Sequence, residues 1–98
     1  MNNVEMIKFV TDEITRALKD AEESLNNKSV GIASGRPISN KNAVINFEFA
    51  MGEYFSYMHI LEELDIDLFV KMFDESDEKR HEMYNRFDTL YNKLKEEE

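Results

Sequence analysis

The chain has 98 residues, no cysteine, and 21 acidic against 12 basic residues, which gives a formal net charge of −9 at pH 7. The lack of cysteine excludes disulfides, thiolate zinc sites and thiol nucleophiles. The negative charge disfavours direct binding to nucleic acid or to anionic membranes, because both repel an acidic protein at long range.

Residues 1–98 suffice for one hydrophobic core, so we expect a single domain. The N-terminus meets acidic residues before any apolar run of signal-peptide length. The most apolar segment, residues 43–61, is interrupted by Asn46, Glu48 and Glu53 and does not resemble a membrane span. We therefore expect a cytoplasmic protein.

The first predicted helix covers residues of about 3–26. Its apolar positions recur at alternating spacings of three and four, which indicates an amphipathic helix: Val4, Ile7, Thr11, Ile14, Leu18, Ala21 and Leu25. Residues 27–39 contain two glycines, three serines and the only proline, and are predicted to form a loop. The loop is basic, through Lys28 and Arg36, and the sequence leaves open whether it is a second contact site.

A second helix is predicted over about 40–64, capped by Ser39 or Asn40. Its apolar seam consists of Val44, Phe47, Met51, Tyr54, Met58 and Leu61. Further apolar residues lie off this seam: Ile45, Phe49, Phe55, Tyr57 and Ile60. A helix that is apolar on several sides must be covered on several sides. We expect it to be the central helix or to offer part of its surface to another chain.

A short helix is predicted over about 66–73, since Ile66, Phe69, Val70 and Phe73 share one helical face and no partner strand exists. We expect it to lie across the end of the bundle. The last helix, about 76–95, is predicted to be capped by Asp74 or Ser76 and to have an acidic first turn. The predicted fold is all-α, a small helical bundle of three long helices plus one short connecting helix.

The net charge is concentrated in one third of the chain. Residues 48–78 hold ten acids and one base, Lys71, so this segment alone sums to −9. The remaining residues hold eleven acids and eleven bases and sum to zero. Acids that only kept the protein in solution would not need such segregation.

Metal binding is the first chemistry to consider among these acids. Asp74, Ser76 and Glu78 match the start of a calcium loop, but its glycine and its final glutamate are missing. His59 with Glu62 and Glu78 with His81 are spaced by three residues and resemble half of a di-iron motif. Two surface ion pairs explain them more simply, and we expect no metal and no cofactor.

Catalytic signatures are also missing. Two histidines and a few scattered serines do not form a recognisable nucleophile and base. The glycines of residues 30–37 match neither phosphate-loop pattern. We expect no catalytic residue and no enzymatic activity.

No family motif matches these residues. In size, acidity and lack of cysteine the chain resembles the stand-alone inhibitors of phages and mobile elements, including anti-CRISPR-like proteins that occupy nucleic-acid grooves of defence nucleases. The resemblance implies a nucleic-acid mimic that binds a basic groove of a partner protein. The predicted contacts are Glu62, Glu63, Asp65, Asp67, Asp74 and Glu75, with Phe69 or Tyr57 as an aromatic anchor.

The alternative is a structural or adaptor protein that forms a homodimer through the surplus apolar surface of helix 40–64. Both functions are compatible, because an acidic dimer can also be an inhibitor. A carboxylate and histidine metal bundle is the third hypothesis.

Overall fold

The computed structural model describes residues 2–97, and these are almost entirely helical. The helices are α1 (Asn3–Leu25), α2 (Asn40–Leu64), α3 (Ile66–Glu75) and α4 (Asp77–Glu97), with a short 3-10 turn at Gly31–Ala33. No strand occurs in the described part of the chain, where the only β-type pairing is an isolated antiparallel bridge between Lys28 and Pro37. The all-α prediction is confirmed.

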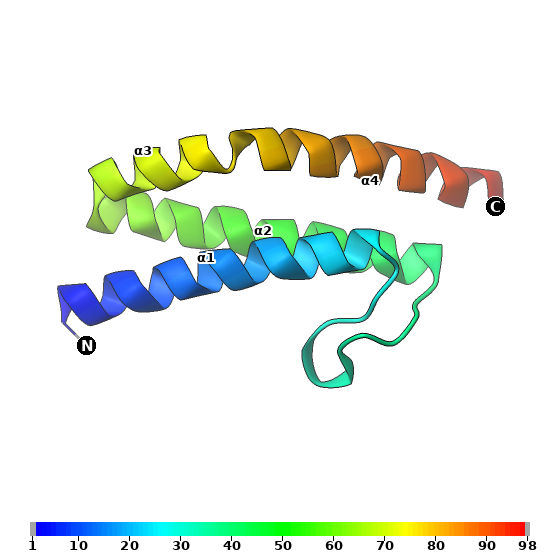
Figure 1. Ribbon diagram of the computed structural model, residues 1–98, viewed down its shortest axis with the longest axis horizontal. Helices are drawn as coiled ribbons and strands as arrows, with labels where there is room; N and C mark the ends of the chain where they lie inside the picture. Colours follow the sequence, from blue (N-terminus) through cyan, green and yellow to red (C-terminus); the bar gives the residue numbers. More distant parts are fainter. Residues whose placement is uncertain (1, 98) are drawn as a thin grey trace.

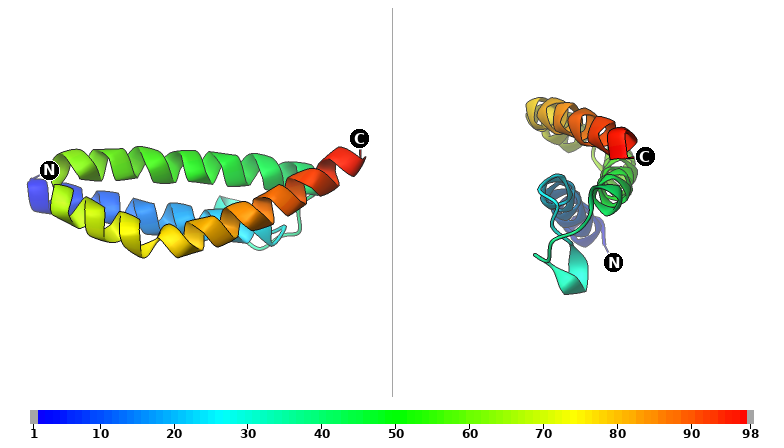
Figure 2. Two further views of the ribbon diagram at one scale, coloured as in Figure 1. Left: turned by 90° about the horizontal axis from the view of Figure 1, so that it is seen from above. Right: turned by 90° about the vertical axis from the view of Figure 1, so that its right-hand side faces the viewer.

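The helices form an elongated and flattened structure, with extents of 47 × 27 × 16 Å. In Figure 1, α1 and α2 run antiparallel, and α3 and α4 follow one another back along α2. The end-on view in Figure 2 shows α1 and α4 on different sides of α2. The second helix is therefore the central one, as its sequence predicts.

The core lies mainly between α1 and α2. Small residues line this contact, since Ala17, Ala21, Ala43 and Ala50 are at most 2 % exposed. Side chains of this size let two helix backbones approach closely, so larger residues can interdigitate beside them. Those larger residues include Val10, Ile14, Phe47, Met51, Tyr54, Met58 and Leu61.

The fourth helix packs on α2 through aromatic rings. Phe47 of α2 stacks on Phe87, with ring centroids 4.8 Å apart, and meets the edge of Tyr84 at 5.5 Å. Only Met83 and Leu90 of α4 are buried. The helix thus covers one side of α2 while most of its own surface stays exposed.

The third helix does not lie across the end of the structure, and this expectation is wrong. Asp65 ends α2 in an extended conformation and caps α3, its side chain accepting a hydrogen bond from the Leu68 amide at 3.1 Å. The chain therefore reverses at one residue, and α3 packs along α2 (Figure 1). None of the residues of α3 is fully buried.

A polar cluster fixes the bend between α3 and α4, and we call Tyr54, Phe73, Ser76 and Arg80 the α3–α4 joint. The Tyr54 hydroxyl lies 2.5 Å from the Ser76 hydroxyl, which donates to the Phe73 carbonyl at 3.0 Å. The Arg80 guanidinium donates to the same carbonyl at 3.0 Å and covers the Phe73 ring at 3.8 Å. The Ser76 side chain thus binds a carbonyl at the C-terminal end of α3. It does not cap α4, contrary to expectation.

The loop between α1 and α2 is closed at its base. Asn27, which has a left-handed φ of 56°, donates its side-chain amide to the Ile38 carbonyl at 3.2 Å and to the Asn40 side chain at 2.8 Å. Ser39 caps α2 by accepting from the Asn42 amide at 3.1 Å. At the tip, Gly31 and Gly35 have φ values of 79° and 88°, which favour glycine over residues with a side chain.

Candidate functional site

The six predicted acidic contacts extend from the last turn of α2 to the last turn of α3. Glu62 and Glu63 lie in the last turn of α2, and Asp65 is the residue between the helices. Asp67 lies in the first turn of α3, and Asp74 and Glu75 lie in its last turn. We call this group the acidic end.

Basic residues from the other helices do not neutralise the acidic end. Within residues 2–97, none of its six carboxylates forms an ion pair with a lysine or arginine. Of the other acids in residues 48–78, Glu53 pairs with Arg16 of α1 at 2.7 Å and Asp77 with Arg80 at 3.4 Å. The segregation of charge along the sequence therefore persists in space.

On α1, in contrast to the acidic end, several carboxylates form ion pairs with basic side chains. Arg16 contacts Glu13 at 2.7 Å and Asp20 at 2.8 Å in addition to Glu53. These carboxylates raise the pKa of Arg16, with Glu53 and Glu13 as the main causes. In the described structure none of the six carboxylates at the acidic end is thus bound to lysine or arginine, whereas six acids outside it are: Asp12, Glu13, Asp20, Glu22, Glu53 and Asp77.

Two of the six carboxylates occupy unfavourable places in their helix. Glu62 and Glu63 lie in the last turn of α2, which contains no basic residue. The C-terminus of a helix is the negative end of its dipole, where a carboxylate costs about 0.3–1 kcal/mol. Folding alone would favour lysine or arginine at these two positions, whereas Asp74 and Glu75 end α3 just before the N-terminus of α4, whose dipole favours acids.

The carboxylates do not all lie on one face. Asp67 and Asp74 are seven residues apart, so they share one face of α3. Glu75 lies about 100° around the helix from Asp74 and lines a groove toward α1. Asp65 differs from the others because its side chain caps α3, so its substitution would also weaken the helix.

The two predicted aromatic anchors are partly buried. Phe69 packs against the core and stacks on Phe73 with centroids 5.5 Å apart. Tyr57 also packs against the core and meets Phe9 of α1 edge-on at 6.2 Å. Each ring offers only part of its surface to a partner, because α3 and α1 fold onto α2 at these positions.

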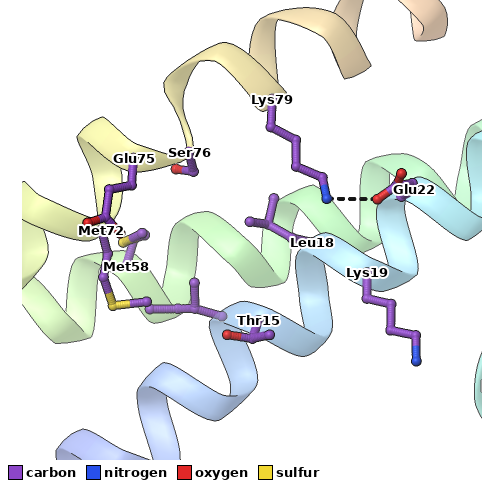
Figure 3. A pocket seen from close by; sticks show the side chains of 10 residues that line it. Thr15, Leu18, Lys19, Glu22, Met58, Met72, Glu75, Ser76 and Lys79 are labelled. Carbon is purple, nitrogen blue, oxygen red and sulfur yellow. Dashed lines mark ion pairs between the residues drawn. The ribbon is translucent and has the colours of Figure 1, made fainter.

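A groove of about 360 Å³ separates α1 from the α3–α4 segment (Figure 3). Its floor is apolar and includes Leu18, Met58 and Met72. On one edge, Lys79 of α4 reaches Glu22 of α1 at 2.8 Å, and this hydrogen bond and charge lower the pKa of Glu22. The groove continues the acidic end toward α1 through Glu75.

The histidine and carboxylate pairs do not combine into a metal site. His59 Nδ1 lies 3.7 Å from Glu62 within α2. His81 Nδ1 lies 3.7 Å from Asp77, and Glu78, which the spacing predicts as its neighbour, forms no ion pair with it in the described structure. No group of three or more metal-ligating side chains is found within residues 2–97.

A second surface lies on the side of α2 that faces away from α1 and α4. Ile45, Phe49, Gly52, Ser56 and Ile60 recur at spacings of three and four and are all exposed. We call them the outer stripe. Ile45, Phe49 and Ile60 are among the surplus apolar residues that the sequence predicts. Gly52, a weak helix former in the middle of a long helix, was not predicted as part of this surface.

The α3–α4 joint was also missed. Tyr54 belongs to the predicted seam of α2, and Ser76 was expected to cap α4, but no spacing links these residues to Arg80. Only the reversal at Asp65 brings them together.

No family model, no curated protein and no solved structure matches the chain. None of the helices within residues 2–97 combines the length and apolar character that a membrane crossing needs.

Proposed function

We propose that the chain is a small acidic protein-binding module that occludes a basic, nucleic-acid-binding site on a partner protein. The observation that supports this is the set of unpaired carboxylates at the acidic end, next to acids on α1 that are bound to bases. Uncompensated charge is available to arginine and lysine of a partner, and it also steers the approach of a basic surface.

The placement of the acids adds a second reason. Glu62 and Glu63 lie where the dipole of α2 disfavours negative charge. A protein that retains such residues gives up some folding stability. Binding to a basic partner supplies the compensation, because the same carboxylates become paired in the complex.

The proposed mechanism is steric and electrostatic occlusion without catalysis. Carboxylates around the end of α2 and along α3 take the place of phosphates in a groove lined with arginine and lysine. The groove bordered by Glu75 adds an apolar floor that a long basic side chain can cover with its methylene groups. Nucleases of host defence systems, the targets of anti-CRISPR-like inhibitors, are the partner class that we propose to test first.

The test uses the variant Glu63→Lys/Asp74→Lys, since both residues are exposed and lie in C-terminal helix turns. Lysine is favourable in the last turn of α2, by about 0.3–1 kcal/mol, and residue 74 is exposed, so the variant is expected to fold about as well as the natural protein. Loss of function in this variant cannot then be attributed to unfolding. The matched control is Glu82→Lys/Asp88→Lys, which makes the same charge change at exposed positions of α4.

Displacement of a labelled DNA from purified RNA-guided nucleases is measured by fluorescence anisotropy. We expect the natural chain and the control to displace the DNA, with a potency that falls as salt screens the charges. The Glu63→Lys/Asp74→Lys variant is expected to lose at least tenfold in potency. Equal potency of this variant and the control would contradict the assignment of the site.

A further inference from the structure

The outer stripe of α2 is more exposed than an isolated protein needs. Phe49 is 70 % exposed, Ile45 is 53 % exposed and Ile60 is 41 % exposed. Single exposed apolar residues are common on protein surfaces, but contiguous apolar patches mark sites of association. Three large apolar residues along one helix face form such a patch.

Gly52 lies in the middle of this patch, and the isolated chain gives no reason for it. A Cβ atom at residue 52 would meet nothing within 4 Å, and the backbone there does not have the positive φ that favours glycine. Glycine in a helix interior weakens the helix. A second helix that packs across residue 52 would explain it, because glycine permits close approach of two backbones.

The total surface also points to a missing contact. The accessible surface of the chain is 6525 Å², whereas a compact monomer of this mass exposes about 5800 Å². The excess of about 700 Å² is close to the roughly 800 Å² that each partner buries in a specific interface of standard size. The radius of gyration of 14.7 Å, against about 13 Å for a compact chain of this length, agrees.

The charges on α2 decide which partner and which orientation fit. Lys41 is the only base on α2 and lies one turn before Ile45, whereas Glu63 lies one turn after Ile60. A second copy of α2 laid antiparallel on the first, with Phe49 facing Ile60, places Lys41 and the Glu63 of the other copy at the same end of the contact, about 7 Å apart along the axis. A parallel arrangement would place like charges together at both ends, at an energetic cost.

We infer that the outer stripe is the interface of a homodimer in which the two α2 helices pack antiparallel. The two-fold axis passes near residues 52–56, where Gly52 and Ser56 let the helices approach. In this register Phe49 of each copy packs against Ile60 of the second copy. Such an interface is isologous, so it closes after two copies and does not propagate.

The oligomeric state is measured by sedimentation over a range of micromolar concentrations. We expect the natural chain to be a dimer, and Phe49→Glu to weaken dimerisation at least tenfold because it buries a charge in the interface. Gly52→Arg is expected to do the same, since its side chain has room in the monomer but not between two helices. Val4→Glu is the control, because Val4 is 78 % exposed on α1 and lies outside the stripe.

A monomer at all concentrations would overturn the inference. Binding of a different protein to this face would not rescue it, because the inference is that a second copy of the chain binds there. Unchanged dimerisation of Phe49→Glu and Gly52→Arg would overturn the choice of surface. Neither result affects the proposed contacts of Asp67 and Asp74, which lie on α3, whereas Glu63 on α2 belongs to both proposals.

The orientation is tested by cross-linking, which is straightforward because the natural chain has no cysteine. Ser56→Cys lies near the proposed axis and is expected to form a disulfide between two copies. Ile45→Cys should not, because in the antiparallel register two such residues lie about 28 Å apart along the helices, far beyond the roughly 7 Å limit between Cα atoms. A mixture of Ile45→Cys with Glu63→Cys is expected to form the heterodimer. A disulfide between two copies of Ile45→Cys would overturn the antiparallel arrangement.

Discussion

The first helix and the α3–α4 segment both run antiparallel to the central helix α2, yet they contribute differently to the protein. Of the fifteen buried apolar residues in the described structure, thirteen belong to α1 and α2, and only Met83 and Leu90 belong to α4. Apolar burial is the dominant favourable term in folding. The first two helices therefore carry most of the stability.

The α3–α4 segment is held from one side. It contacts α2 through Phe47, Phe87 and the α3–α4 joint, and it contacts α1 through the polar pairs Lys79 with Glu22 and Arg86 with Asn26. Local opening of a protein begins where few apolar contacts must be broken. Three of the six proposed contact residues therefore lie on the less firmly packed part of the protein, the α3–α4 segment.

The largest expected effect is on the α1–α2 contact. Ile14→Ala removes a side chain that is 1 % exposed and should lower the free energy of unfolding by about 3–4 kcal/mol, through lost burial and the cavity that remains. Leu94→Ala on α4, where the side chain is only partly buried, should cost about half as much. Urea denaturation of both variants measures the difference. Equal losses would contradict the unequal roles of the two pairs of helices.

The next prediction concerns the α3–α4 joint. Tyr54→Phe removes the hydroxyl that lies 2.5 Å from Ser76 and should destabilise the protein by about 1 kcal/mol, the usual net contribution of such a hydrogen bond. Amide hydrogen exchange should show faster opening of α4 and little change in α1. Tyr91→Phe is the control, because Tyr91 is 40 % exposed. If exchange accelerated equally in all helices, the joint would not hold α4 in particular.

A smaller effect of the opposite sign is expected at Gly52. Gly52→Ala should raise the free energy of unfolding by about 0.5–1 kcal/mol, because alanine is the better helix former and its Cβ has free space. Thermal unfolding at a dilution where the chain is monomeric measures this effect without a contribution from association. A loss of stability would show that Gly52 has a role within the single chain.

The smallest effect is a pH dependence at the contact of α1 with α4. The hydrogen bond and charge of Lys79 lower the pKa of Glu22 from its ordinary value of 4.5. A lowered pKa contributes stability that is present above pH 4.5 and is lost as the pH falls through the lowered value. Both side chains are about half exposed, so the contribution should stay below about 0.5 kcal/mol. Glu22→Gln should reduce the difference in melting temperature between pH 7 and pH 3, and an unchanged difference would rule out this pair as a source.

Periodicity predicted the helices well because it reports which residues face a core. The first helix was expected at about 3–26 and occupies Asn3–Leu25, and the second was expected at about 40–64 and occupies Asn40–Leu64. The path of α3 was not predictable in this way. Its direction depends on the extended conformation of Asp65, which reverses the chain within one residue.

The composition of residues 48–78 indicated the acidic end but not its details. Ten acids against one base cannot pair among themselves, so open carboxylates were foreseeable from counting alone. That Glu53 meets Arg16, and that Phe69 turns its ring toward the core, depend on how α1 and α3 pack on α2. Gly52 was missed because helical spacing shows where apolar residues face and not what covers them.

The positions of the chain ends have a practical consequence. In Figure 1 the N-terminal end of α1 lies at the same end of the molecule as the turn between α2 and α3, and α4 finishes at the far end. The long dimension of the molecule is 47 Å. A fluorescent label or an affinity tag fused after α4 would therefore stand well away from the acidic end, whereas the same fusion placed before α1 would crowd it.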